Sequence, residues 1–188
     1  MKKSLILTSL ALTALSFSSV IQAKEVAGVE VAEKLDVTHA QLQLNGAGVR
    51  SKFFMDLYVG SLYLPAPQTE LDAVLAQPHS VVRLNITSGM ITSEKMQDAI
   101  NEGFELATKD DVASIQTEVD TFMTFLSHEI VEGDQFTFVT QKDMGVTTFK
   151  NGQQLGVIEG EAFRQALLKI WLGDKPAQKS LRKKMLNK

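Results

Sequence analysis

Residues 135–158 constrain the fold most strongly, because three segments of alternating hydrophobicity follow one another with short connections. The segments are 135–140, 146–150 and 153–158. Residues 142–145 connect the first two, and Asn151 with Gly152, a pair typical of two-residue hairpin turns, connects the last two. Connections this short join antiparallel strands, so the sequence predicts a three-stranded antiparallel meander.

Two further strands are predicted upstream of this meander. Residues 57–64 are mainly apolar on both alternating faces, which is typical of a central strand covered on both sides. Residues 80–87 alternate between an apolar face and a face that includes Arg83. Because arginine is mostly exposed in proteins, we expect Arg83 to be solvated.

A tight turn is predicted at 45–48, between two extended segments. The sequence Asn-Gly-Ala-Gly at these positions tolerates positive φ angles. The turn would deliver Arg50 onto a strand whose neighbour carries both tyrosines of the chain, Tyr58 and Tyr63.

Helical spacing of apolar residues occurs between and after the strands. Helices are predicted at 69–77, from Thr92 or Ser93 to about 107, from 110 to about 126, at 159–172 and from about 176. Runs of strands with helices grouped between and after them indicate an α+β domain rather than a doubly wound one. We therefore expect an antiparallel sheet with helices packed mostly on one face.

The first 23 residues have the pattern of a secretory signal peptide. Lys2 and Lys3 precede an apolar stretch at 5–17, and a small-residue cleavage site ends at Ala23. Cleavage there leaves a single domain, 24–188, whose net charge is −5, since 19 − 2 = 17 basic and 22 acidic side chains remain. We expect a periplasmic or secreted protein with no stable membrane span after cleavage. An uncleaved N-terminal anchor is the alternative.

Composition excludes several functional classes. The chain has no cysteine, which excludes disulfides, thiolate metal sites and thiol nucleophiles. Its net charge of −3 is unfavourable for a broad phosphate-binding surface, so we expect no nucleic-acid partner. His39, His79 and His128 lack metal-ligand spacing, and no phosphate-binding or dinucleotide-binding glycine motif occurs. We therefore expect neither a metal nor a cofactor.

Arg50 and Tyr58 are the strongest candidates for ligand binding. Arginine is always charged and offers planar, bidentate donors, while a tyrosine hydroxyl adds a neutral donor. Such a pair suits a carboxylate or an enolate oxygen at the mouth of an apolar cavity. The alternative is a structural role in which Arg50 pairs with an internal carboxylate such as Asp56, and the residues alone favour neither.

The stretch Asn-Gly-Ala-Gly-Val-Arg at 45–50, followed by Gly-Ser-Leu-Tyr-Leu at 60–64, resembles the chalcone isomerase-like family, here its bacterial exported branch. Residues 160–173, a helix that ends in glycine, resemble a late helix of that family. The resemblance extends from about residue 40 to the end of the chain. It implies an open-faced β-sandwich, a large antiparallel sheet backed by a layer of helices, with the ligand cleft between them.

The resemblance also implies roles for single residues. In the plant enzymes of the family, an arginine steadies the anion while a threonine and a tyrosine act on the substrate ketone. Non-catalytic members bind fatty acids through the arginine and a neighbouring hydroxyl. Arg50 matches the arginine, Tyr58 takes the threonine position, and Thr92 is the best match for the tyrosine. Ala99 and Ile170 occupy the remaining polar positions, so most of the catalytic constellation is missing.

The leading interpretation is a periplasmic protein that binds a fatty acid or a similar apolar anion without catalysis. Arg50 and Tyr58 would hold the head group, and Thr92 and Ile170 would also line the site. One alternative is an isomerase or intramolecular lyase for an enone-type substrate, with Arg50 as electrostatic catalyst. Another is an envelope scaffold or interaction protein that uses the basic residues at 179–188. No pattern predicts an oligomeric state.

Overall fold

The computed structural model describes residues 23–37, 40–109 and 111–188. The predicted signal peptide therefore lies outside the described residues, except for Ala23. Within the described ranges, no helix is long and apolar enough to cross a membrane.

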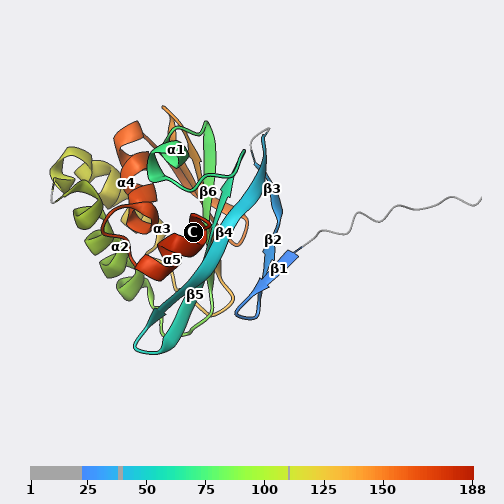
Figure 1. Cartoon of the computed structure of the whole chain (residues 1–188). Coiled ribbons are helices and arrows are strands. Elements are labelled where there is room, and N and C mark those ends of the chain that lie inside the picture. The colour runs from blue at the N-terminus through green and yellow to red at the C-terminus, as the bar shows by residue number, and fades with distance from the viewer. Residues whose placement is uncertain (1–22, 38–39, 110) are drawn as a thin grey trace, which may run out of the picture.

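Seven strands form one antiparallel sheet whose spatial order follows the sequence order (Figure 1). They are β3 (Lys34–Val37), β4 (Ala40–Lys52), β5 (Met55–Leu64), β6 (His79–Ile86), β7 (Gln135–Gln141), β8 (Gly145–Lys150) and β9 (Gln153–Glu159). A separate hairpin consists of β1 (Ala23–Val26) and β2 (Val29–Ala32). The predicted meander is confirmed, because β7, β8 and β9 pair in sequence order.

The helices of the described chain lie on one side of the sheet, and the β1–β2 hairpin lies on the other (Figure 1). The helices are α1 (Leu71–Leu75), α2 (Ser93–Thr108), α3 (Gln116–Phe125), α4 (Glu161–Leu172) and α5 (Lys179–Met185). A 3-10 turn, Val112–Ile115, precedes α3, which begins later than predicted. This arrangement confirms the predicted α+β class with helices on one face.

The sheet is covered on both faces, but unequally. The main core lies between the sheet and the helices. There Phe122 packs against Phe104 and Phe138, with ring centroids 6.1 and 5.6 Å apart. A smaller core on the opposite face contains Val59 of β5 and Val31 of β2. β5 is therefore a central strand buried on both sides, as its sequence predicts.

Arg83 lies on this second face, and the expectation that it is solvated is wrong. Its side chain is half-buried, its Nε donates to Thr137 Oγ1 (3.1 Å), and its guanidinium lies 5.8 Å from the centre of the Tyr63 ring. Strands β5 and β7 supply these partners from either side of β6. The alternation of residues within β6 cannot predict partners that neighbouring strands supply.

The predicted turn at 45–48 is also wrong, because β4 runs through these residues without reversing. The β4–β5 register shifts between Leu44 and Gly46, so Asn45 forms a bulge. The chain reverses later, at the two-residue connection formed by Phe53 and Phe54.

The glycines of this segment serve a close approach between β4 and α5. A Cβ atom at Gly46 would collide with the carbonyl oxygen of Lys184, and one at Gly48 would lie 2.7 Å from the Lys184 Cβ. The buried side chain of Asn45 donates to the carbonyl of Met185 (2.7 Å), which fixes the end of α5 on the bulge. Helix and strand thus meet backbone to backbone.

Replacing Gly46 with alanine is expected to destabilise the protein, because the added methyl group forces α5 away from β4. We expect the free energy of unfolding, measured in urea, to fall by about 1–3 kcal/mol. Gly89→Ala is the matched control, since nothing lies within 4 Å of a Cβ added there. Equal stability of the two variants would contradict this packing.

A buried arginine anchors the beginning of α4. Arg164 donates through Nε and Nη2 to the two carboxylate oxygens of Glu161 (2.7 and 2.6 Å) and through Nη2 to the carbonyl of Leu75 (2.8 Å). The hydrogen bonds from Arg164 lower the pKa of Glu161 to about 2, against the effect of burial. Hydrogen bonds from Gln165 and from the backbone of Asp143 act in the same direction as Arg164.

The depressed pKa makes the contribution of Glu161 to stability depend on pH. It is fully present above the ordinary pKa of about 4.5 and is lost as the pH falls toward 2. We expect Glu161→Gln to lower the free energy of unfolding by about 2 kcal/mol at neutral pH. The difference from wild type should shrink in urea titrations at progressively lower pH. A difference that does not change with pH would contradict the ion pair.

Candidate functional site

The β4–β5 hairpin places Arg50 and Tyr58 directly opposite each other. Their Cα atoms are register partners, so the two side chains share one face of the sheet. Tyr58 belongs to the main core, which identifies this face as the one that the helices cover. The register therefore brings together the two residues that the sequence singles out.

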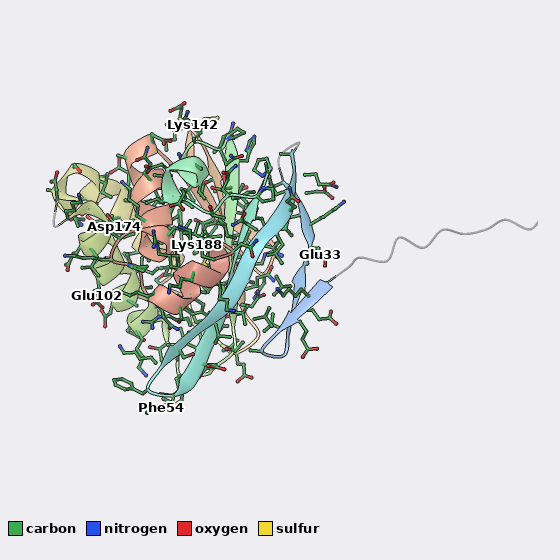
Figure 2. All side chains as sticks on the ribbon, viewed as in Figure 1. Glu33, Phe54, Glu102, Lys142, Asp174 and Lys188 are labelled. Atoms are coloured by element: carbon green, nitrogen blue, oxygen red, sulfur yellow. The ribbon has the colours of Figure 1, made fainter. Side chains whose placement is uncertain are left out.

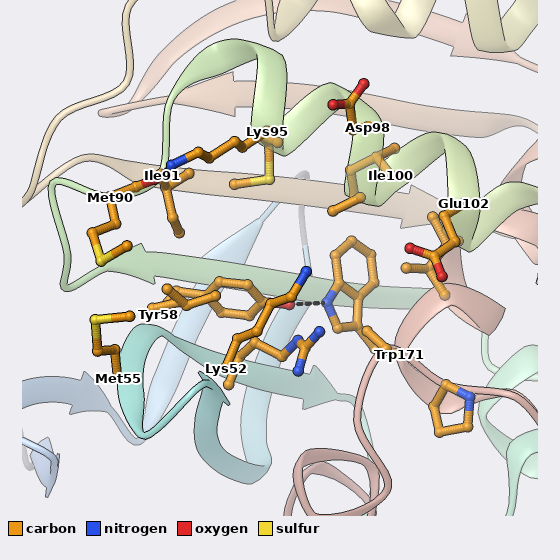
Figure 3. A pocket seen from close by; sticks show the side chains of 18 of the residues that line it. Lys52, Met55, Tyr58, Met90, Ile91, Lys95, Asp98, Ile100, Glu102 and Trp171 are labelled. Carbon is orange, nitrogen blue, oxygen red and sulfur yellow. Dashed lines mark hydrogen bonds between the residues drawn. The ribbon is translucent and has the colours of Figure 1, made fainter.

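A cavity of about 450 Å³ opens between this hairpin and the helices (Figure 3). Pockets for small molecules typically fall in the range of ~300–1,000 Å³. The hairpin contributes Arg50, Lys52, Phe53, Met55, Leu57 and Tyr58 to its wall. The helices and the segments that precede α2 and α5 contribute the rest: Met90, Ile91, Lys95, Met96, Asp98, Ala99, Ile100, Glu102, Gly103, Leu106, Ile170, Trp171, Pro176 and Ala177. Most of these side chains are apolar, and the charged ones come from β4 and α2.

Tyr58 is tied to the helix layer by one buried hydrogen bond. The indole Nε1 of Trp171 in α4 donates to the Tyr58 hydroxyl oxygen (2.9 Å), as the dashed line in Figure 3 marks. Burial raises the pKa of the Tyr58 hydroxyl, while the hydrogen bond from Trp171 and the charge of Arg50 act in the opposite direction. Tyr58 is therefore a neutral phenol at physiological pH. Because indole is only a donor, the phenol proton is not used on Trp171 and is free to point at a ligand.

Arg50 is positioned without neutralisation of its charge. Its Nη1 donates to the carbonyl of Ser51 (3.0 Å) and to Oε1 of Gln178 (3.0 Å), which also accepts from the backbone N–H of Ser51 (2.9 Å). No carboxylate of the described chain forms an ion pair with Arg50. Asp56, the alternative partner, instead accepts a hydrogen bond from the Ser51 hydroxyl (2.8 Å). The contacts thus favour a ligand-binding role for Arg50 over the structural alternative.

The other two predicted site residues have different environments. Ile170 is buried in α4 and lines the cavity. It packs so closely on α2 that a Cβ at Gly103 would lie 2.8 Å from its Cγ2. Thr92 caps α2, accepting from the backbone N–H of Lys95 (3.3 Å), and it borders a second hollow with residues 129–132. Thr92 is not among the residues that line the first cavity.

Trp171 lines the cavity and contacts Tyr58, and its place in the site is not predicted from the sequence. It is the single tryptophan of the chain, which is a signal of interest, but it follows Ile170 in an apolar helix typical of a core. Trp171 and Tyr58 are 113 positions apart in the sequence, so no local pattern predicts their contact.

The arrangement suits one kind of ligand chemistry. A charged guanidinium and a neutral phenol donor can both hydrogen-bond to an anionic oxygen, and the adjoining wall is largely apolar. Among the described residues, no group of three His, Cys, Asp or Glu side chains gathers to hold a metal ion. Fold and site together define an α+β domain with a largely apolar cavity between a sheet and its helix layer, and Arg50 and Tyr58 both line this cavity.

Comparison with known proteins identifies the family. The family model described as chalcone isomerase-like matches residues 23–187, so the chain belongs to the chalcone isomerase-like family. Among solved structures, the fold is similar to the crystal structure of a fatty-acid binding protein of Arabidopsis thaliana. The TM-score is 0.63 and the identity 12%, and the match covers 85% of this chain and 92% of that chain. A search of curated proteins finds no match.

Replacing Trp171 with phenylalanine tests the buried hydrogen bond. The variant loses the donor that favours the Tyr58 phenolate, so the pKa of Tyr58 should rise further. The measurement is a pH titration of tyrosinate absorbance in a Tyr63→Phe background, where Tyr58 is the remaining tyrosine. The Tyr63 hydroxyl is a suitable one to remove, because it is buried without a hydrogen-bond partner among the described residues. An unchanged titration curve would contradict the role given to Trp171.

Proposed function

We propose that this protein binds a fatty acid or a similar apolar anion in the cavity, without catalysis. The observation that carries the proposal is the pairing of an arginine that no described carboxylate neutralises with a neutral tyrosine hydroxyl at an apolar cavity. The similar Arabidopsis structure is that of a fatty-acid binding protein, which supports the same ligand class here. The pattern of residues 1–23 supports export, so we place the mature chain in the periplasm or outside the cell.

The head group and the tail of such a ligand would be bound by different interactions. Hydrogen bonds to charged partners contribute about 1.5–3 kcal/mol, and Arg50 offers donors of this type to a carboxylate. Each methylene group buried in the apolar wall contributes about 0.8 kcal/mol. Affinity should therefore increase with chain length until the cavity is filled.

Binding is better supported than catalysis by the residues around the cavity. Ala99 and Ile170 occupy two positions at which the family resemblance implies polar catalytic residues. Neither side chain can donate a hydrogen bond. Thr92, the nearest match to a third, uses its hydroxyl as a helix cap. Loss of one oriented donor typically lowers a catalytic rate by ~10²–10³-fold. Arg50 and Tyr58 alone are sufficient for binding an anion.

Arg50→Gln is expected to weaken binding of a long-chain fatty acid by about 10–100-fold, because a charge-assisted hydrogen bond is lost. Isothermal titration calorimetry measures the affinity. Arg83→Gln is the matched control, since Arg83 is also half-buried on the same sheet but on its opposite face. Wild type should bind the fatty alcohol of equal length more weakly than it binds the acid. Arg50→Gln should bind this alcohol with nearly the same affinity as wild type does. Equal affinities of both arginine variants for the acid would contradict the proposal.

The family description supplies a second candidate, an isomerase acting on an enone-type substrate with Arg50 as electrostatic catalyst. If binding is the function, purified protein should cyclise a chalcone no faster than buffer does, as followed by absorbance. Saturable turnover that Arg50→Gln abolishes would favour the enzyme instead.

A scaffold role for the basic C-terminal helix has less support. Arg182 donates to the carbonyl of Leu172 (2.8 Å), and Lys188 pairs with Glu70 (2.6 Å). Part of the positive charge of residues 179–188 is therefore used inside the domain.

A further inference from the structure

Exposed apolar side chains gather at one end of the molecule. Among the described residues, seven large apolar side chains are exposed, and four of them surround the β4–β5 turn: Phe53, Phe54, Met55 and Met90. Phe53 is 78% exposed and Phe54 is fully exposed. Figure 2 shows Phe54 at the end of the hairpin, on the opposite side of the molecule from Lys142. We call these four residues, with Lys52 and Lys95, the tip patch.

The backbone conformation of the β4–β5 turn is unfavourable for the two phenylalanines that form it. Phe53 and Phe54 connect the paired residues Lys52 and Met55, and their φ angles are +50° and +66°. A two-residue hairpin with positive φ at both positions strongly favours asparagine and glycine, and bulky residues are rare there. The fold therefore tolerates backbone strain and also leaves two aromatic rings in water. Neither feature stabilises the domain by itself, which indicates a role outside it.

The tip patch is continuous with the mouth of the cavity. Phe53, Met55 and Met90 are exposed on the surface and also line the cavity. Figure 3 shows Met55 and Met90 on the same side of the cavity. Lys52 and Lys95 flank the apolar residues, and the Lys52 ammonium lies 5.7 Å from the centre of the Phe53 ring. Acidic residues also lie nearby: Asp56 accepts a hydrogen bond from the Ser51 hydroxyl, and Asp98 and Glu102 of α2 line the cavity. Aromatic rings flanked by lysines are typical of segments that enter the interface of a lipid bilayer.

We infer that the tip patch docks the protein on a lipid bilayer that contains anionic lipid. Phe53 and Phe54 enter the interface, while Lys52 and Lys95 contact the head groups. A bilayer fits these features better than a flat protein partner does, because Phe53 and Phe54 form the connection at the end of the β4–β5 hairpin, where Figure 2 labels Phe54. Docking turns the cavity mouth toward the membrane, so an apolar anion passes between bilayer and cavity without crossing water. This last step rests on the proposed function, whereas docking does not.

Flotation with vesicles of equal parts phosphatidylcholine and phosphatidylglycerol tests the inference. Wild type should float with the vesicles, and Phe54→Gly should bind them about tenfold more weakly, since one aromatic anchor is lost. Glycine suits the positive φ at this position, so the melting temperature of the variant should equal or exceed that of wild type. Met144→Gly, which removes an exposed apolar side chain from the β7–β8 connection, should float like wild type. Phe54→Trp should retain binding.

The outcomes separate this inference from the proposed function. Phe54 does not line the cavity, so fatty-acid affinity without vesicles should be the same in Phe54→Gly and wild type. Vesicle binding without any fatty-acid affinity would leave docking standing and overturn the proposed ligand. Absence of wild-type flotation, or equal flotation of Phe54→Gly, would overturn docking. A dimer in lipid-free sedimentation that Phe54→Gly abolishes would also overturn it, by assigning the patch to self-association.

Discussion

The register between β4 and β5 is the constraint on which the site depends. It makes Arg50 and Tyr58 direct partners on the helix-facing side of the sheet. A slip of one residue would turn either side chain to the opposite face, away from the cavity. Two irregularities flank the paired stretch, one at Asn45 and one after Arg50. The first also receives α5, because its bulged asparagine bonds to the end of that helix. Strand register, helix position and binding site are thus set by the same short segment.

Arg164 and Arg50 lie in contrasting environments. Arg164 is completely buried, and Glu161 together with the carbonyl of Leu75 satisfies most of its donors. Arg50 is half-buried and is held by Ser51 and Gln178 through neutral oxygens alone. A buried charge without an ionic partner is costly unless something else supplies the opposite charge. Arg164 therefore has the environment of a structural residue, whereas the charge of Arg50 is left for the anion of the proposed function.

Local pattern predicts much of this fold and less of its site. The meander 135–158 and the buried stripe of α2 follow from periodicity, because short connections and helical spacing are local properties. The turn is misplaced because the glycines at 46 and 48 accommodate α5, which lies more than 130 residues further along the chain. The true turn is missed because phenylalanine is unfavourable at positive φ. Trp171 meets Tyr58 only after the helices pack on the sheet.

The central claim is that Arg50 receives the anionic head of an apolar ligand in the cavity. NMR of a fatty acid labelled at its carboxyl carbon measures this directly, because the carboxyl resonance reports ionisation of the bound head group. Beside Arg50 the bound carboxyl should titrate at a lower pH than the same acid bound to Arg50→Gln, since a nearby positive charge favours the carboxylate. Identical titration of the acid on both proteins would contradict the claim.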